Sequence, residues 1–335
     1  MRRVLLVLLL LDAFGSSQTR TRVCKPCIAA HEHFLASDAL QGRGSATANE
    51  LLAAEYIAAE LEQYGIRPGI NNGYIQTVQA DVDLSKLPLD KMPAQTSRAF
   101  KNAVQDGKLT TRNVIGILPG SDPKLKKQVI LLSAHMDHMG VVPEEALNGD
   151  SIFNGADDDA SGVAAVLELA RALAGSKPKR TVMFVLFGSE ELGGYGARYF
   201  LDHPPVPLTS IVANLEFEMI GRPDAAIASH TLWLTGFERS NLGPELAKHG
   251  ARLVKDPHPD QKFFTRSDNY ALAKRGVVAH TVSSFGLHKE YHRPNDDVAH
   301  LDLDHMADAI GSMIVPVKWL VNSSFRPRWN AGQKP

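Results

Sequence analysis

Apolar runs alternate with amphipathic stretches over most of the chain, and this pattern predicts alternating strands and helices. Residues 182–187 form an unbroken apolar run between Arg180 and Gly188, and residues 129–134 (VILLSA) form another. Runs of this length are typical of strands that are buried on both faces of a sheet. Shorter apolar runs predict further strands at residues 114–118, 211–217, 230–234 and 277–283.

Amphipathic stretches with recognisable ends predict the helices. Residues 47–65 begin with a capping box of Thr47 and Glu50, carry an apolar face, and end at Gly65. Residues 161–175 also carry an apolar face and end at Gly175. The remaining predicted helices are a short one at residues 244–249 and a closing one at residues 303–322, in which Pro316 is expected to produce a kink.

This alternation predicts a single α/β domain of three layers, in which a largely parallel mixed sheet carries helices on both faces. The domain is expected to span residues 24–323. Residues 71–112 are polar and interrupted by prolines, and we expect an edge hairpin and a surface excursion there. Residues 324–335 are expected to form a solvated tail.

Composition narrows the classes of partner. The 335-residue chain has 44% hydrophobic and 22% charged residues and a net charge of −1, without a basic stripe, so nucleic-acid or membrane-surface binding has no support. Residues 1–17 combine Arg2 and Arg3 with a short apolar core and small residues, which is typical of a signal peptide. The core is too short to span a bilayer. We therefore expect an exported protein, periplasmic or extracellular, with no stable membrane anchor in the mature chain.

Two local patterns near the start of the predicted domain have ordinary interpretations. Cys24 and Cys27 are the only cysteines, and two thiols cannot close a zinc site. They predict a local disulfide in an exported protein, or no role at all. His31 and His33 lie beside apolar residues and are more typical of an ordinary helix than of a metal site.

Acidic and histidine residues follow the predicted strands. Glu190 and Glu191 follow residues 182–187, His135 follows residues 129–134, and Glu218 closes residues 211–217. Open α/β sheets bind ligands at the carboxyl ends of their strands, so these side chains are expected to converge. Two further residues lie in loops. Asp158 lies in the loop GADDDASG before the next predicted helix, and His292 lies in the loop after residues 277–283.

This set of two histidines and three carboxylates suits a metal centre. Zinc accepts such nitrogen and oxygen ligands readily, and manganese or cobalt can substitute for it. One carboxylate shared by two ions would let both act on a single water. Asp137, two residues after His135, is placed to orient that imidazole. Without cations these carboxylates would repel one another.

At this point the chain resembles a known family, the co-catalytic di-zinc exopeptidases, which include secreted bacterial leucine aminopeptidases, glutamate carboxypeptidases and glutaminyl cyclases. The resemblance covers roughly residues 31–320. The motifs that carry it are LASDALQGRG, SAHMDHMG, NGADDDASG, FGSEELGG, NLEFEMIG, RSDNYALAKRGV and EYHRPNDD, in this order. It implies a fold of the zinc-exopeptidase type and two Zn²⁺ ions per chain.

The resemblance also implies roles for individual residues. One zinc is expected on His135 and Glu218, the other on Glu191 and His292, and Asp158 is expected to bridge both. Relatives hold the peptide bond after the bridging aspartate in the cis form, which we therefore expect between Asp158 and Asp159. Glu190 resembles the general base of the family, and Tyr291 resembles a residue that stabilises the oxyanion.

Three positions leave alternatives open. Many family members have aspartate where this chain has Glu218, which puts the metal preference in doubt, and Glu216 is a competing ligand on the same strand. His138 is expected to line the substrate pocket, with a ligand role as the alternative. Asp268 resembles a family residue near that pocket, although a hydrogen bond that shapes its loop would explain it equally well.

The resulting functional hypothesis is an aminopeptidase that hydrolyses the N-terminal bond of peptide substrates. A carboxypeptidase would need cationic groups for the terminal carboxylate, for which Arg222, Arg266 and Arg293 are the candidates near the site loops. Glutaminyl cyclase-like chemistry and a non-catalytic binding protein are further alternatives. Neither the side-chain preference nor the oligomeric state can be predicted from the sequence.

Overall fold

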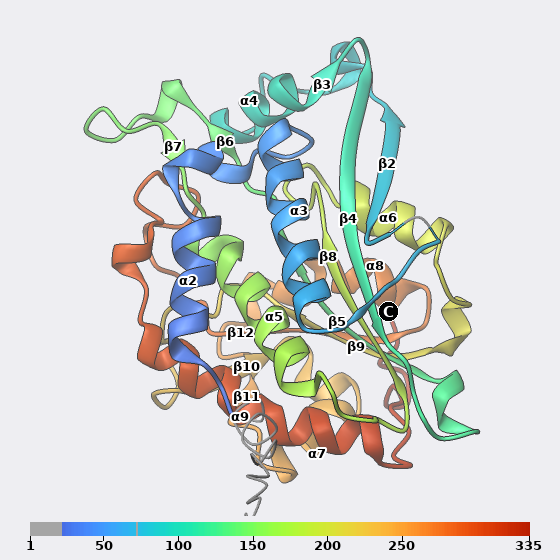
Figure 1. Cartoon of the computed structure of the whole chain (residues 1–335). Helices are drawn as coiled ribbons and strands as arrows, with labels where there is room; N and C mark the ends of the chain where they lie inside the picture. Colours follow the sequence, from blue (N-terminus) through green and yellow to red (C-terminus); the bar gives the residue numbers. More distant parts are fainter. Residues whose placement is uncertain (1–21, 72) are drawn as a thin grey trace, which may run out of the picture.

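A twisted mixed sheet runs through the molecule, and the longest apolar runs form its centre (Figure 1). The computed structural model describes residues 22–71 and 73–335. Four parallel strands lie side by side in the order β8, β5, β9 and β12. Their bounds are Thr181–Phe187 for β8, Val129–His135 for β5, Ile211–Phe217 for β9 and Val278–Ser283 for β12.

Antiparallel strands extend this parallel centre on both sides. Next to β8 lies β4 (Lys108–Leu118), which also pairs with β1 (Arg67–Pro68), β2 (Ile75–Asp81) and β3 (Val104–Gln105). Next to β12 lies β10 (Leu232–Leu234), which pairs in parallel with β11 (Leu253–Lys255). The prediction of a largely parallel mixed sheet is confirmed, although β10 starts two residues later than expected and β4 is longer.

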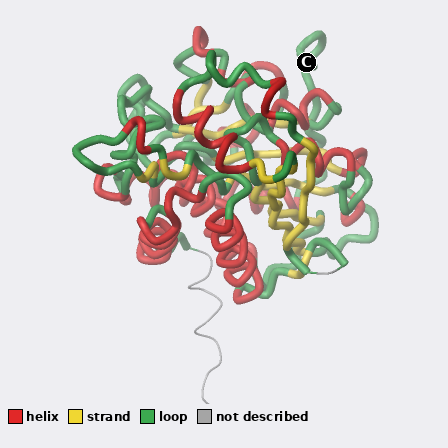
Figure 2. The backbone as a smooth tube through the Cα atoms, turned by 90° about the horizontal axis from the view of Figure 1, so that it is seen from above, coloured by secondary structure: helices red, strands yellow, loops and turns green. Residues whose placement is uncertain are grey.

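Helices cover both faces of the sheet, as predicted (Figures 1 and 2). One apolar cluster joins one face to α2 (Lys25–Leu35), α3 (Ala48–Gln63), α5 (Gly162–Leu173), α7 (Leu242–Lys248) and α9 (Leu303–Asn322). A second cluster joins the other face to α6 (Tyr195–Asp202) and α8 (Asn269–Lys274). The side chains of β5 and β9 therefore meet helices on both sides, and this explains why their sequences lack polar alternation.

The local sequence determines where α3 begins, through its N-terminal cap. The Thr47 hydroxyl accepts hydrogen bonds from the backbone N–H groups of Asn49 and Glu50, as the predicted capping box requires. The Glu50 carboxylate accepts from the N–H of Ala46, one residue before the expected partner, and also from the Thr111 hydroxyl on β4. The same carboxylate therefore ties the helix to the sheet.

The excursion at residues 71–112 contains more structure than predicted. Its hairpin of β2 and β4 is confirmed, but α4 (Ala94–Ala103) was not expected from its polar sequence. The helix buries Ala99, Phe100 and Ala103 against a small apolar cluster that includes Phe153 and Leu192. Phe153 belongs to a short ribbon of β6 (Gly140–Val141) and β7 (Ile152–Phe153).

The end of the chain is docked, so the expectation of a solvated tail is wrong for residues 325–330. The Arg180 guanidinium donates a hydrogen bond to the carbonyl of Phe325. The Trp329 ring lies 5.2 Å from the ring of His280 on β12. Burial of two aromatic rings outweighs the polar character of the segment. The preceding helix α9 continues through Pro316 as one element, so the expected kink does not interrupt it.

The first part of the domain agrees with the ordinary interpretations. Cys24 and Cys27 form a disulfide at the start of α2, where Cys24 is the N-cap and Cys27 lies in the first turn. His31 is buried in this helix and its Nδ1 lies 2.8 Å from the Tyr56 hydroxyl, which is a packing role. The predicted signal peptide lies outside the described residues. In the part of the chain that the structure describes, no helix is long and apolar enough to cross a membrane.

Candidate active site

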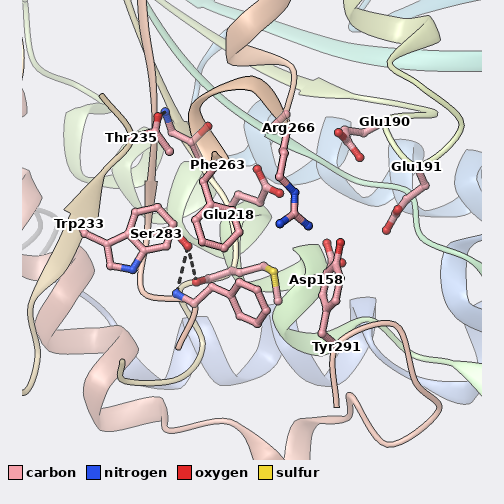
Figure 3. Close-up of a pocket in the computed structure, with 14 residues that line it drawn as sticks. Asp158, Glu190, Glu191, Glu218, Trp233, Thr235, Phe263, Arg266, Ser283 and Tyr291 are labelled. Atoms are coloured by element: carbon pink, nitrogen blue, oxygen red, sulfur yellow. Dashed lines mark hydrogen bonds between the residues drawn. The ribbon is translucent and has the colours of Figure 1, made fainter. Parts of the chain in front are cut away.

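The ends of the parallel strands bring the predicted side chains close together. His135 is the last residue of β5, Glu218 directly follows β9, and Glu190 follows β8 in the sequence by three residues. Because these strands are parallel, their carboxyl ends share one edge of the sheet. A cavity of about 500 Å³ lies there and is lined by Asp158, Glu190, Glu191, Glu218 and Tyr291, among others (Figure 3).

Asp158 lies between the two predicted histidine ligands. Its Oδ1 is 3.1 Å from Nε2 of His135, and its Oδ2 is 3.1 Å from Nε2 of His292. The peptide bond between Asp158 and Asp159 is cis, as the resemblance implied. Each oxygen of one carboxylate thus faces a different imidazole, which is the arrangement that a bridging ligand needs.

Glu191 also lies between two imidazoles, and it shares one of them, His292, with Asp158. Its Oε2 is 3.3 Å from Nε2 of His292, and its Oε1 is 2.8 Å from Nδ1 of His138. Nitrogen and oxygen atoms of His138, Asp158, Glu191 and His292 all lie within 4.8 Å of one another. His138 is fully buried and does not line the cavity, and it contacts Glu191 instead.

The orientation of the imidazoles fits bound cations. Nδ1 of His135 lies 3.2 Å from the backbone carbonyl of Asp137, to which it must donate, so Nε2 carries the lone pair. This Nε2, like Nε2 of His292, is buried without a hydrogen-bond partner although an Asp158 oxygen lies 3.1 Å away. Two ligands of one tetrahedral zinc ion lie roughly 3.3 Å apart. The residues therefore fit zinc at this place.

The pKa values describe a site that stabilises positive charge. Burial would raise the pKa of Asp158, but His135 and His292 hold it well below its usual range. Burial would likewise raise the pKa of Glu191, but His292 and His138 lower it to about 2. Burial would lower the pKa of His292, but Glu191 and Asp158 raise it to about 10. A bound cation supplies the same positive charge.

Glu190 differs from these ligand candidates. Burial raises its pKa well above the ordinary range, and His135 offsets only part of the rise. Burial also raises the pKa of Glu218, again offset in part by His135. Among the described residues, Glu190 forms no salt bridge with the histidines that contact Asp158 and Glu191. It is therefore a carboxyl group that lies beside the cluster without belonging to it.

Glu216 on β9 and Glu218 directly after this strand lie in different surroundings. Glu218 lines the cavity together with Asp158 and Glu191. Glu216 does not line it, and both of its carboxylate oxygens are buried without hydrogen bonds. The geometry favours Glu218 over Glu216 as the ligand.

Asp137 supports the site in a different way from the one predicted. Its carboxylate Oδ1 lies 3.8 Å from Nδ1 of His135, and the shorter contact of that nitrogen is with the backbone carbonyl of Asp137. The carboxylate instead accepts hydrogen bonds from the backbone N–H groups of Glu190 and Glu191 and from the Ser45 hydroxyl. One residue thus fixes both the imidazole and the glutamate pair.

Tyr291 lies on the side of Asp158, and apolar residues that include Trp233 line the other side of the cavity (Figure 3). The Tyr291 ring stacks on His292 with 3.9 Å between ring centroids. Burial, with Asp158 and Glu191 nearby, raises the pKa of Tyr291 above its ordinary value, so its hydroxyl stays a donor. The apolar part of the wall consists of Met219, Trp233, Phe263 and Phe285.

Several buried residues that shape the site were not predicted. Arg43 donates hydrogen bonds to four backbone carbonyls, including those of Met136 and Gly155 on either side of the cluster. Asp159 accepts from the N–H groups of His135 and Met219. Asp296 accepts from the N–H of Asp158. Arg43 and Asp296 belong to motifs that carried the resemblance, but spacing alone gives no sign of such backbone contacts.

The three arginines considered for a terminal carboxylate differ in their contacts. Arg222 pairs with Glu290 and Arg293 pairs with Glu145, each at 3.0 Å. Arg266 lines the cavity, and its guanidinium points toward the acidic side chains (Figure 3). Asp268, the other predicted pocket residue, does not line this cavity, and burial raises its pKa to about 7.

Comparisons with known proteins agree with this geometry. Residues 113–316 match the sequence profile of peptidase family M28. The chain is 30% identical over 176 residues to a probable leucine aminopeptidase 2 of Aspergillus oryzae, which is 50% of this chain and 32% of that protein. It is 24% identical over 226 residues to aminopeptidase YwaD of Bacillus subtilis, which is 65% of this chain and 47% of that protein. These matches span a third to a half of the relatives.

A solved structure shares the fold over a greater length. The zinc aminopeptidase BSAP of Bacillus subtilis superimposes with a TM-score of 0.66, covering 91% of this chain and 96% of that one. The sequence identity of this pair is 15%, so the likeness concerns the fold.

Proposed function

This chain belongs to peptidase family M28, and from that premise we propose that it is a zinc-dependent aminopeptidase that removes the N-terminal residue of peptides. Its relatives include proteins named as aminopeptidases. The observation that carries the proposal is the position of Asp158, whose two carboxylate oxygens face His135 and His292 beside the carboxyl group of Glu190.

We propose that five residues hold two zinc ions. His135 and Glu218 would hold one, Glu191 and His292 the other, and Asp158 both. His138 would act as a positioning residue, because its contact with Oε1 of Glu191 leaves Oε2 toward His292. Zinc supplies Lewis acidity, which lowers the pKa of water and polarises the substrate carbonyl. Manganese or cobalt are substitutes with the same ligand preferences.

Glu190 would move the proton. It accepts a proton from the attacking water while the water oxygen forms a bond to the scissile carbonyl carbon. It then gives that proton to the leaving nitrogen as the carbon–nitrogen bond breaks. Burial raises its pKa, which brings the group closer to the operating pH than an exposed glutamate would be. Asp137 would keep Glu190 in place through its backbone N–H.

Other residues would bind the substrate. The side chain of the N-terminal residue fits the apolar wall of Met219, Trp233 and Phe285. The free amine fits the carboxylates of the cluster, which favour a cation. The Tyr291 hydroxyl, which stays protonated, would donate a hydrogen bond to the oxyanion.

Paired substrates test this function. Zinc-loaded protein is expected to hydrolyse aminoacyl peptides and to leave the same peptides intact when their amine is acetylated. Equal rates on both would favour a carboxypeptidase, for which Arg266 offers the cationic group. No turnover on any peptide, with two zinc ions bound, would favour a non-catalytic binding protein. Cyclisation of N-terminal glutamine, followed in parallel, would identify a glutaminyl cyclase.

We further propose that the protein is exported. The disulfide between Cys24 and Cys27 supports this, because such bonds persist in oxidising compartments. Cell fractionation with thiol labelling tests it, since export predicts an oxidised protein outside the cytoplasm.

A further inference from the structure

Two cavities meet at Glu190. The first is lined by the carboxylates proposed as metal ligands and by the apolar wall. The second has a volume of about 560 Å³ and extends away from the cluster, between the segment that follows β8 and helix α8. Glu190, Arg266 and Ser267 line both. A substrate held with its scissile bond beside Glu190 can therefore occupy both cavities at once.

The second cavity is rich in cations. Arg198, Arg266 and Lys274 line it, and all three are exposed. The salt bridges of the described residues involve other arginines and lysines. Each of the three lies over an aromatic ring at 4.5 to 4.9 Å, namely Tyr195, Phe263 and Tyr270. These rings hold the cationic groups in place without neutralising them.

Two carboxyl groups line the same cavity, and their negative charge must be weighed against the three cations. Glu190 and Asp268 line it, and Asp268 is only 4% exposed. The three cations outnumber them and are exposed, whereas Asp268 is buried and Glu190 is half-buried. An anion that enters from the solvent therefore meets the cations first.

The direction of the substrate follows from the proposed function, on which this inference rests. The acyl part of the substrate carries the free amine and lies with the metal-ligand candidates. The leaving nitrogen must receive its proton from Glu190, so the leaving part lies on the far side of Glu190. That side is the second cavity. The group that leaves from a dipeptide is an amino acid with a free carboxylate.

We propose that Arg198, Arg266 and Lys274 form a subsite for the α-carboxylate of the leaving amino acid, so that dipeptides are the preferred substrates. Arg266 lies between the two cavities and would reach the carboxylate nearest to the scissile bond. Lys274, which lines only the second cavity, would add charge at its outer side. A charge-assisted hydrogen bond of this kind contributes roughly tenfold or more in binding.

Steady-state kinetics with matched substrates test the subsite. Leucyl-alanine and leucyl-alanine amide differ only in the carboxylate. The free acid is expected to have a kcat/KM about tenfold higher or more, mainly through a lower KM, and the preference should fall as salt screens the exposed cations. Leucyl-aspartyl amide serves as a third substrate, with a carboxylate on the side chain instead.

Variants locate the effect. Lys274→Met and Arg266→Gln should each reduce the ratio of the two kcat/KM values several-fold, with the amide as the internal reference. Lys101→Met is the matched control, since Lys101 is an exposed lysine of α4 outside both cavities. Its ratio should equal that of the unchanged protein.

The outcomes separate this inference from the function on which it rests. Hydrolysis of both substrates at equal efficiency would overturn the subsite and leave the aminopeptidase intact. A preference for leucyl-aspartyl amide over leucyl-alanine would also overturn it, because the carboxylate would then belong to a side chain. Failure to hydrolyse either compound would contradict the aminopeptidase itself.

Discussion

Single carboxyl groups with different neighbours account for the chemistry of the site. Asp158 forms salt-bridge contacts with three imidazoles and Glu191 with two, whereas Glu190 forms none with them among the described residues. Residues of one chemical type thus separate into the proposed metal ligands and the group that we propose as the proton carrier. The separation follows from backbone position, because Glu190 and Glu191 are adjacent and point in different directions (Figure 3).

Replacing Glu190 tests its role as the proton carrier. Glu190→Gln keeps the size of the side chain but cannot accept a proton, so kcat is expected to fall about 10²- to 10⁴-fold. Zinc content, measured by mass spectrometry, should stay the same because Glu190 is not among the proposed ligands. Glu55→Gln on the exposed face of α3 is the control. Full activity of the Glu190→Gln protein would exclude the role.

Gly155 is required by the close packing around Asp158. Its φ is +60°, and a Cβ there would lie 2.2 Å from the carbonyl oxygen of Asp158 and 2.6 Å from Cγ of His138. Gly155→Ala is therefore expected to cost about 1–3 kcal/mol in unfolding free energy from overpacking, and to lower zinc content.

Gly149→Ala is the matched control for this experiment. Gly149 also has a positive φ, of +90°, but a Cβ there would meet nothing within 4 Å. The Gly149→Ala protein therefore has an alanine at a positive φ, which costs stability, but it has no steric clash. Equal effects of the two substitutions on zinc content would show that packing at Gly155 does not support the site.

Many of the individual residues of the candidate site could be predicted from the sequence. The family motifs gave the residues that gather at the cavity, because each motif combines a ligand type with a fixed place after a strand. The role of Asp137 was predicted in part, since its carboxylate binds backbone N–H groups and only its carbonyl accepts from His135. Spacing gives the neighbour of a residue but not which atom of it is used.

Individual strands and helices could be predicted where their sequence carries a long apolar pattern. The four central strands and helices α3, α5 and α9 have long apolar patterns, and all were predicted. Helices α4, α6 and α8 have ten residues or fewer and were missed. Their position depends on contacts with distant segments, such as α4 with the β6–β7 ribbon, and such contacts leave no periodic pattern in a short helix.

Strand β12 carries a buried histidine that links three elements. Nδ1 of His280 lies 2.6 Å from the carbonyl of Thr235, Nε2 lies 2.7 Å from the Ser240 hydroxyl, and the ring packs against Trp329 of the tail. Burial lowers the pKa of His280 from 6.5 to about 4. The neutral ring, with one donor and one acceptor, satisfies both hydrogen bonds.

This histidine predicts a loss of stability in mild acid. Between pH 6.5 and pH 4 the unfolded chain binds a proton at this residue and the folded chain does not, so unfolding free energy falls as pH falls. The contribution between pH 7 and pH 5 is about 2 kcal/mol. His280→Gln keeps a donor and an acceptor but cannot ionise.

Denaturant unfolding at the two pH values measures the effect. The difference in unfolding free energy between pH 7 and pH 5 is expected to shrink in His280→Gln. It should stay unchanged in His33→Gln, which alters an exposed histidine of α2. An identical pH dependence in all three proteins would contradict the assignment of a neutral buried ring.

At the scale of the whole molecule, the sheet topology creates the site. Parallel strands place their carboxyl ends together, and residues up to 157 positions apart therefore meet at one carboxylate, as His135 and His292 do at Asp158. This convergence could be predicted, because it follows from strand order alone. The two cavities could not, since their walls come from loops whose conformation depends on the assembled fold.

The concentration of carboxyl groups makes the whole fold sensitive to metal. Asp158, Glu190, Glu191 and Glu218 line one cavity and repel one another without cations. Removal of zinc by a chelator is therefore expected to lower Tm by about 5 °C or more, and added zinc should restore it. Calcium, which needs more oxygen ligands, should not. A Tm that chelation leaves unchanged would contradict metal binding at this cavity.

Anomalous X-ray diffraction at the zinc absorption edge, from crystals of the zinc-loaded protein, tests the two-metal site most directly. Two peaks are expected at the carboxylate of Asp158, one beside His135 and Glu218 and the other beside Glu191 and His292. A single peak, or peaks away from Asp158, would contradict the proposed metal centre and the hydrolytic function that depends on it.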